Sequence, residues 1–180
     1  MKRKTTLWIV VVVVILAALL LFFFNRKCQQ TQLSGETICY QNPILRIKFD
    51  YNAGWKAKSS GLIQGYPTQY TGEDGFFVVN AIPKEGSLIE TVRSIIAEDP
   101  VFYGAKPSVE EQIINSKIGY FIYPDPQFVI GEKHPACYVT ELSNPTYYNG
   151  KTCSVLLIFS NKKELSKIVK SLDSYYPSQQ

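Results

Sequence analysis

The chain is poor in the residues on which most catalytic and metal chemistry depends. Its 180 residues include one histidine, His134, and neither an H-E-x-x-H motif nor a C-x-x-C pair. Structural zinc needs three or four Cys, His or carboxylate ligands. No glycine-rich phosphate loop is present. Glu73-Asp74, between two glycines, lacks the repeated Asp/Asn spacing of a calcium loop and is typical of a turn. We therefore expect no metal and no cofactor.

His134 lies three residues before Cys137, in GEKHPACYVT, and this spacing raises the question of a thiol nucleophile. Such a nucleophile needs a base within hydrogen-bond reach. On an extended strand, residues three apart are separated by about 10 Å and point to opposite faces. The alternative is a surface histidine beside a structural cysteine. We expect no catalytic dyad, and the protein is not predicted to be an enzyme.

An excess of basic charge is also missing from the folded part. The net charge is +4, but five of the 19 basic residues flank the N-terminal apolar run, which leaves 14 against 15 acidic residues. A nucleic-acid-binding domain carries a clustered basic surface. The sequence therefore predicts no nucleic-acid partner.

The longest feature present is LWIVVVVVILAALLLFFF, residues 7–24, which contains no polar side chain apart from the tryptophan ring N–H. As a helix, eighteen residues span about 27 Å, close to the thickness of a bilayer's hydrocarbon core. A cleaved signal peptide or a lipidated Cys28 are alternatives, but small residues do not precede a cleavage point here. Lys2, Arg3 and Lys4 outnumber Arg26 and Lys27, which favours a cytoplasmic N-terminus.

Four cysteines are consistent with an oxidising exterior and allow three pairings. The favoured pairing joins Cys28 to Cys39, which are close in sequence, and Cys137 to Cys153, which lie on two strands predicted to be sequential. Free buried thiols are the alternative.

The domain reads as α+β. LRIKFDY (45–51) alternates apolar and polar residues as a half-buried strand does. Two helices are predicted, each opened by a capping residue, Ser87 and Asn161, with Glu three positions later. The turn signal Asn149-Gly150 joins the last two strands. The predicted elements are strands 45–51, 75–82, two within 110–123, 136–142 and 153–160, with helices after 87 and 161. This is a mostly antiparallel sheet of about six strands with two main helices.

Three stretches resemble a known module: GYPTQYTGEDGFFVVNAI (65–82), FYGAKPSVEE (102–111) and YYNGKTCSVLLIFSNKKELSKIVKSL (147–172). They resemble an uncharacterised extracytoplasmic module of Gram-positive bacteria, which stands behind one membrane helix or follows antirepressor-type zinc metallopeptidases. More remotely, Tyr51-x-x-Gly-Trp55 and the final strand and helix resemble the Mog1/PsbP fold. The resemblance covers about residues 44–173 and implies an accessory or sensing role without catalysis.

Aromatic residues are what remains for a binding site. Six of the twelve tyrosines fall in predicted loops or at strand ends, where a tyrosine offers contact area with a polar tip. The alternative is that these rings cover the ends of the core. The candidate surface consists of Trp55, Tyr66, Tyr70, Tyr103, Tyr123, Tyr147 and Tyr148.

These observations predict a cytoplasmic N-terminus (1–6), a transmembrane helix (7–24), a polar tether (25–43), an extracytoplasmic α+β domain (44–176) and a tail (177–180). We expect a single-pass protein of the cytoplasmic membrane whose outer domain binds a protein, peptide or glycan partner. The alternative is an envelope hydrolase or transferase that uses carboxylates and tyrosines.

Overall fold

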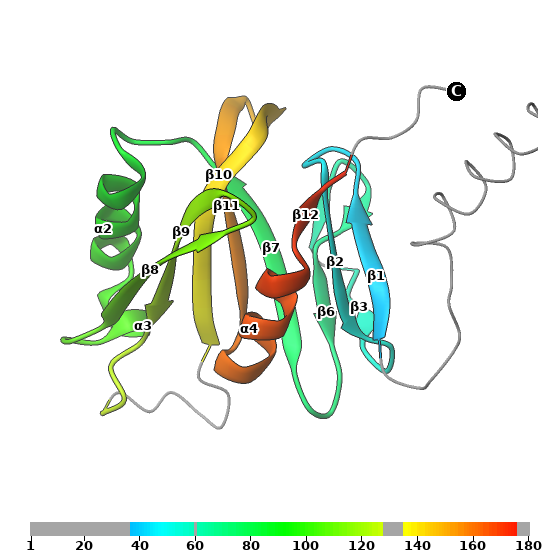
Figure 1. Ribbon diagram of the computed structural model, residues 1–180, viewed down its shortest axis with the longest axis horizontal. Coiled ribbons are helices and arrows are strands. Elements are labelled where there is room, and N and C mark those ends of the chain that lie inside the picture. The colour runs from blue at the N-terminus through cyan, green and yellow to red at the C-terminus, as the bar shows by residue number, and fades with distance from the viewer. Residues whose placement is uncertain (1–36, 60, 128–134, 176–180) are drawn as a thin grey trace, which may run out of the picture.

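The computed structural model describes residues 37–59, 61–127 and 135–175 (Figure 1). Its centre is a seven-stranded sheet in which every neighbouring pair is antiparallel. The strands, in spatial order, are β3 (Lys56–Ala57), β6 (Gln69–Thr71), β7 (Phe76–Ile82), β11 (Lys151–Asn161), β10 (Pro135–Tyr148), β9 (Lys117–Tyr123) and β8 (Ser108–Ile114).

A second sheet of three antiparallel strands packs against the first. It consists of β1 (Thr37–Asn42), β2 (Ile47–Asn52) and β12 (Asp173–Ser174). A short hairpin, β4 (Leu62–Ile63) and β5 (Tyr66–Pro67), forms a separate two-stranded sheet. The helices within the described ranges are α2 (Leu88–Glu98), α3 (Pro100–Tyr103) and α4 (Lys162–Ser171). The predicted α+β class with a mostly antiparallel sheet is confirmed, with more strands than expected and one additional short helix.

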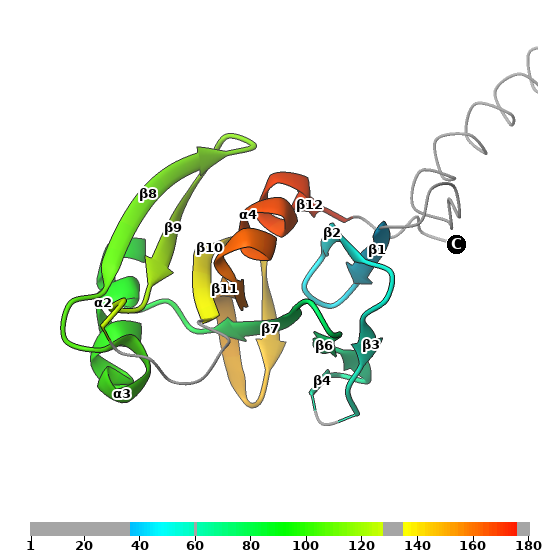
Figure 2. The same cartoon turned by 90° about the horizontal axis from the view of Figure 1, so that it is seen from below.

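Both faces of the large sheet are covered, which explains why its central strands read as continuous apolar runs. Successive residues of β11 enter different cores: Leu156 faces α4 and the small sheet, whereas Leu157 faces α2. Figure 2 shows α2 and α4 on opposite sides of the sheet. The β8–β9 hairpin extends beyond both helices at one border of the sheet.

Both main helices begin where the sequence predicts. Ser87 Oγ accepts a hydrogen bond from Glu90 N–H, and the Glu90 carboxylate accepts one from Ser87 N–H at 2.6 Å, which completes a capping box. Asn161 Oδ1 accepts from Glu164 N–H at 2.9 Å and opens α4. These caps satisfy backbone donors that the first turn leaves unpaired.

The first described strand lies inside the segment predicted as a tether. β1 begins at Thr37, and its inward positions are Tyr40 and Asn42. The predicted transmembrane helix, residues 7–24, lies outside the described residues, as do 1–6, the first part of the tether, His134 and the tail. Within residues 37–127 and 135–175, apart from residue 60, no helix is long and apolar enough to cross a bilayer.

The predicted Cys137–Cys153 disulfide is wrong, because both residues are buried free thiols. Cys137 lies opposite Phe159 and Cys153 lies opposite Thr146. Six residues of β11 separate these two levels of the ladder, about 20 Å at the rise of a strand. A disulfide needs Cα atoms within about 7 Å. Cys28 lies outside the described residues, so the Cys28–Cys39 pairing stays a prediction.

Candidate functional site

The seven aromatic residues predicted to form a binding surface do not form one. Trp55 and Tyr103 are core residues, 3% and 1% exposed, and are therefore corrections to the prediction. Tyr66 and Tyr147 are the well exposed ones, at 40% and 67%. The other rings are partly buried and pack against the core: Tyr70, Tyr123 and Tyr148. The alternative, that these rings complete the core, is the better description of most of the set.

Trp55 is held beneath the acidic turn between β6 and β7. Its Nε1–H donates to Asp74 Oδ1 at 2.6 Å, and Asn52 Nδ2–H donates to Asp74 Oδ2 at 2.8 Å. A Cβ on Gly72 or Gly75 would lie 2.3 or 2.5 Å from the indole ring, so only glycine fits over it. Both carboxylate oxygens of Asp74 are therefore engaged in hydrogen bonds that hold this turn against Trp55 and Asn52. No group of three or more potential metal ligands occurs in the part of the chain that the structure describes.

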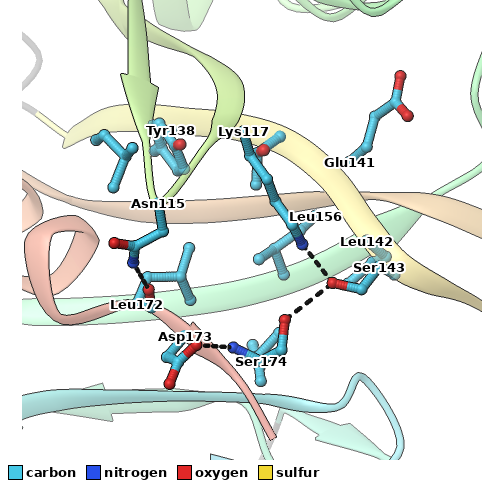
Figure 3. Close-up of a pocket in the computed structure, with 13 residues that line it drawn as sticks. Asn115, Lys117, Tyr138, Glu141, Leu142, Ser143, Leu156, Leu172, Asp173 and Ser174 are labelled. Atoms are coloured by element: carbon cyan, nitrogen blue, oxygen red, sulfur yellow. Dashed lines mark hydrogen bonds between the residues drawn. The ribbon is translucent and has the colours of Figure 1, made fainter.

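A small polar cavity lies where the two sheets and α4 meet (Figure 3). Its volume is about 70 Å³. Apolar side chains from both sheets form the floor, including Ile47, Tyr138 and Leu156. The polar lining comes from the β8–β9 turn, from the irregular middle of β10 and from β12: Asn115, Lys117, Thr140, Glu141, Ser143, Asp173 and Ser174.

A chain of hydrogen bonds closes the rim of this cavity. Lys117 Nζ donates to Ser143 Oγ, which lies 2.9 Å from Ser174 Oγ. Figure 3 shows these three side chains pointing toward one another. Asn115 Nδ2–H donates to the Leu172 carbonyl oxygen at 2.7 Å and ties the hairpin turn to the end of α4. Ser143 thus joins Lys117, 26 positions before it, to Ser174, 31 positions after it.

The turn that carries this lysine is possible because two residues adopt left-handed conformations. Asn115 and Ser116 have φ values of 51° and 64°. Asparagine tolerates this region better than most residues, and a two-residue loop with two positive φ values matches the twist of a hairpin. The tight turn places Lys117 at the first position of β9, next to the cavity rim.

Two acidic residues line the cavity, but they do not form a catalytic pair with each other. Glu141 forms an ion pair with Lys84 at 2.8 Å, and Asp173 forms one with Lys48 at 3.3 Å. Both carboxylates are more than half exposed. Figure 3 shows Glu141 directed away from Lys117 and Ser143. Each carboxylate therefore has its own lysine partner at the surface, and the two do not share one buried site.

A larger, open hollow, about 580 Å³, adjoins the cavity on the α2 side of the sheet. We call it the α2–β9 groove. It shares Lys117 and residues 140–143 with the polar cavity. Most of its exposed surface is apolar, although six of its eleven lining residues are polar or charged. The start of α2 forms one wall, and β9 and β10 form the other. The lining residues are Ser87, Leu88, Ile89, Ser116, Lys117, Ile118, Tyr120, Thr140, Glu141, Leu142 and Ser143.

The groove continues into an exposed apolar strip at the border of the sheet. Ile118 is 50% exposed, and Ile113, directly opposite it on β8, is 72% exposed. Val109, four residues before Ile113 on β8, is 39% exposed on the same face. Tyr120 Oη donates to Glu111 Oε2 at 2.8 Å between them, and this hydrogen bond raises the pKa of Tyr120. Glu111 thus separates Val109 from Ile113 and Ile118, and the exposed apolar surface that adjoins the groove is the Ile113–Ile118 pair. Exposed apolar surface beside a groove is typical of interaction sites.

Sequence reasoning missed the groove residues. The stretch EEQIINSKIGYFIY was predicted as two strands, and β8 and β9 confirm this. The overlooked signal was the isoleucines on both sides of Asn115-Ser116-Lys117, of which Ile113 and Ile118 form a pair. A hairpin at the border of a sheet needs apolar residues only on the face that is covered. Ile113 and Ile118 lie opposite each other where no helix covers them.

Comparison with known proteins adds a likeness to a solved structure. No protein-family model matches the chain, and no curated protein matches it. The solution structure of cyanobacterial PsbP (CyanoP) from Synechocystis sp. PCC 6803 is similar, with a TM-score of 0.47 and 13% sequence identity. The likeness covers 81% of this chain and 96% of that one. At this level it bears on neither the family nor the function of this protein, and the resemblance to the Gram-positive module stays a prediction.

Proposed function

We propose that this protein is a membrane-anchored binding or accessory module that holds a segment of a partner protein in the α2–β9 groove. The observation that carries the proposal is the continuity of the groove with exposed Ile118 and Ile113. A concave apolar surface with a few polar groups is the usual form of a binding site. The apolar lining favours a protein or peptide over a glycan, because sugars are recognised mainly through hydrogen bonds.

The anchoring rests on the sequence. Residues 7–24 are long enough to span a bilayer, and the charges on either side favour a cytoplasmic N-terminus. This orientation presents the domain outside the cytoplasmic membrane. A binding module held there by a single helix senses or recruits its partner at the membrane surface.

The alternative of an enzyme has one observation in its favour. A serine hydroxyl beside an amine is a known pair of nucleophile and base, and Lys117 donates to Ser143 at the cavity rim. In such a pair the lysine is activated by removal from solvent, whereas the contact between Lys117 and Ser143 is exposed. The carboxylates that an acid–base mechanism would use are engaged by Lys84 and Lys48. Binding is therefore the better supported function.

The test is site-specific photocrosslinking in intact cells that produce the full chain. A photoreactive phenylalanine derivative replaces Ile118 in the groove or, as the control, Val101 on α3, which is 67% exposed. The proposal predicts one discrete adduct from position 118, absent from position 101 and abolished by Ile113→Lys. Equal adducts from both positions, or none from position 118, would contradict it.

A further inference from the structure

We propose that the partner segment, beyond the part held in the α2–β9 groove, continues as an extended strand along β8 and carries there two adjacent basic residues flanked by apolar ones. The inference rests on the proposed binding function and specifies the chemistry of the partner. Its basis is the combination of an unprotected sheet border with a fixed pattern of charge and apolar surface on β8.

β8 is an open template for strand addition. It is the last strand of the seven-stranded sheet, and six of its seven residues are exposed. Its pairing with β9 runs without a register shift from Ser108 to Ile114. Border strands are usually blocked from further pairing by proline, a bulge or charged side chains, lysine above all. The sequence SVEEQII contains neither proline nor lysine, so its only blocking groups are two glutamates, whose charge a basic partner strand would neutralise. Figure 2 shows β8 at the outer border of the hairpin.

The side chains of β8 present two different faces. Val109, Glu111 and Ile113 point to the α2 side, because they pair with Ile122, Tyr120 and Ile118 of the α2-facing core and groove. The alternate residues point to the α4 side: Ser108, Glu110, Gln112 and Ile114. An added strand would therefore meet apolar contacts at two positions and a carboxylate on each face.

The two carboxylates define the charge of the partner. Glu110 and Glu111 are adjacent, exposed, and in no ion pair with a basic side chain of residues 37–127 or 135–175. Glu111 accepts a hydrogen bond from the Tyr120 hydroxyl. Burial first, and the charge of Glu110 second, raise the pKa of Tyr123, which places Glu110 near that ring.

A second copy of this chain does not fit the same border. An antiparallel pair of β8 strands centred on the strand would place Glu111 opposite Glu111, or Glu110 opposite Glu111. Like charges directly opposite each other destabilise a sheet. The complementary strand instead has apolar, basic, basic, polar and apolar residues opposite positions 109–113. Main-chain hydrogen bonds would supply affinity and these side chains specificity.

The probe is a fluorescein-labelled nine-residue peptide with Val-Thr-Lys-Lys-Val at its centre, which in an antiparallel strand places both Lys opposite Glu111 and Glu110. The control peptide has Glu in place of both Lys. Binding to the full chain in detergent micelles is measured by fluorescence anisotropy. We expect the basic peptide to bind at least about tenfold more tightly, and E110K/E111K to reverse the preference. E110Q/E111Q should reduce it. E73K/E85K changes the charge equally at two exposed residues outside β8 and should leave it intact. Circular dichroism verifies that each variant folds.

Hydrogen exchange then locates the bound peptide. The proposal predicts slower amide exchange in β8 when the basic peptide is bound. Binding without protection of β8, or equal binding of both peptides, would overturn it. If discrimination is absent but adducts still form from position 118, the strand-addition inference fails while the proposed binding function stands. If neither is observed, both fail.

Discussion

Trp55 donates a hydrogen bond to Asp74 across the acidic turn, and the two atoms lie 2.6 Å apart. The indole is buried, whereas the carboxylate is exposed. Asp74→Ala leaves a buried N–H without its acceptor, which typically costs about 1 to 3 kcal/mol. We expect a lower free energy of unfolding in urea, followed by circular dichroism. Glu73→Ala, at the neighbouring position, is the control and should have little effect. Equal stability of Asp74→Ala and the parent would contradict this role.

The same hydrogen bond predicts a pH dependence. Trp55 is the main reason that the pKa of Asp74 is lowered in the folded state, with Asn52 adding to the effect. The stabilisation that accompanies a lowered carboxyl pKa is fully present above the pKa of the unfolded state, about 3.9. It is lost as the pH falls toward the pKa of the folded state. Unfolding measured between pH 6 and pH 2 should therefore lose stability less steeply in Asp74→Asn than in the parent. A steeper loss in the variant would be inconsistent with the lowered pKa.

Gly119 is the second position where close packing makes a prediction. A Cβ there would lie 2.2 Å from the Tyr138 hydroxyl oxygen, and Tyr138 is 1% exposed, so its ring has no room to move. We expect Gly119→Ala to destabilise the fold by about 1 to 3 kcal/mol. In Gly54→Ala, the new methyl group meets only Asn52 Oδ1 at 3.3 Å, and this control should destabilise the fold much less, because a shift of a few tenths of an ångström relieves the contact. Thermal unfolding of both variants makes the comparison.

The cysteines predict a thiol count. Cys137 and Cys153 are free and buried, and burial raises the pKa of both thiols. We expect neither to react with maleimide in the native chain. In denaturant without reductant, two of the four thiols should react, and reduction should add the pair predicted to join Cys28 and Cys39. Four reactive thiols before reduction would contradict that pairing.

The Ser143 hydroxyl lies between Lys117 and Ser174 at the cavity rim. Ser143→Ala removes the acceptor of Lys117 and the neighbour of Ser174. If the protein is a binding module, adduct formation from position 118 should persist in this variant. Abolition of adduct formation in a folded Ser143→Ala protein, and its return in Ser143→Thr, would contradict this expectation and would show that the Ser143 hydroxyl in the groove contacts the partner.

The sequence predicted the secondary-structure elements better than the contacts that these elements make with distant segments. Both capped helices and the Asn149-Gly150 turn depend on neighbouring residues, so local patterns reveal them. β1 was missed because Asn42 occupies an inward position where alternation requires an apolar residue. Asn42 is buried and satisfied: its Oδ1 accepts from two backbone N–H groups and its Nδ2–H donates to Tyr40 Oη.

The binding surface depended on contacts between distant segments. Trp55 follows a turn and reads as exposed, yet it is covered by glycines 17 and 20 residues later. Cys137 and Cys153 do lie on paired strands, but register, which the sequence did not define, keeps them apart. The groove lies between the start of α2 and the β8–β9 turn, and no local pattern encodes where a helix lies on a sheet.

Occupancy of the groove in the cell tests the central claim most directly. Ile118→Cys and Val101→Cys are labelled with a membrane-impermeant maleimide, once in the purified chain and once in intact cells. The account predicts that labelling at position 118 relative to position 101 is slower in cells than in the purified chain, because a partner covers the groove. The same ratio of rates in both conditions would contradict the account.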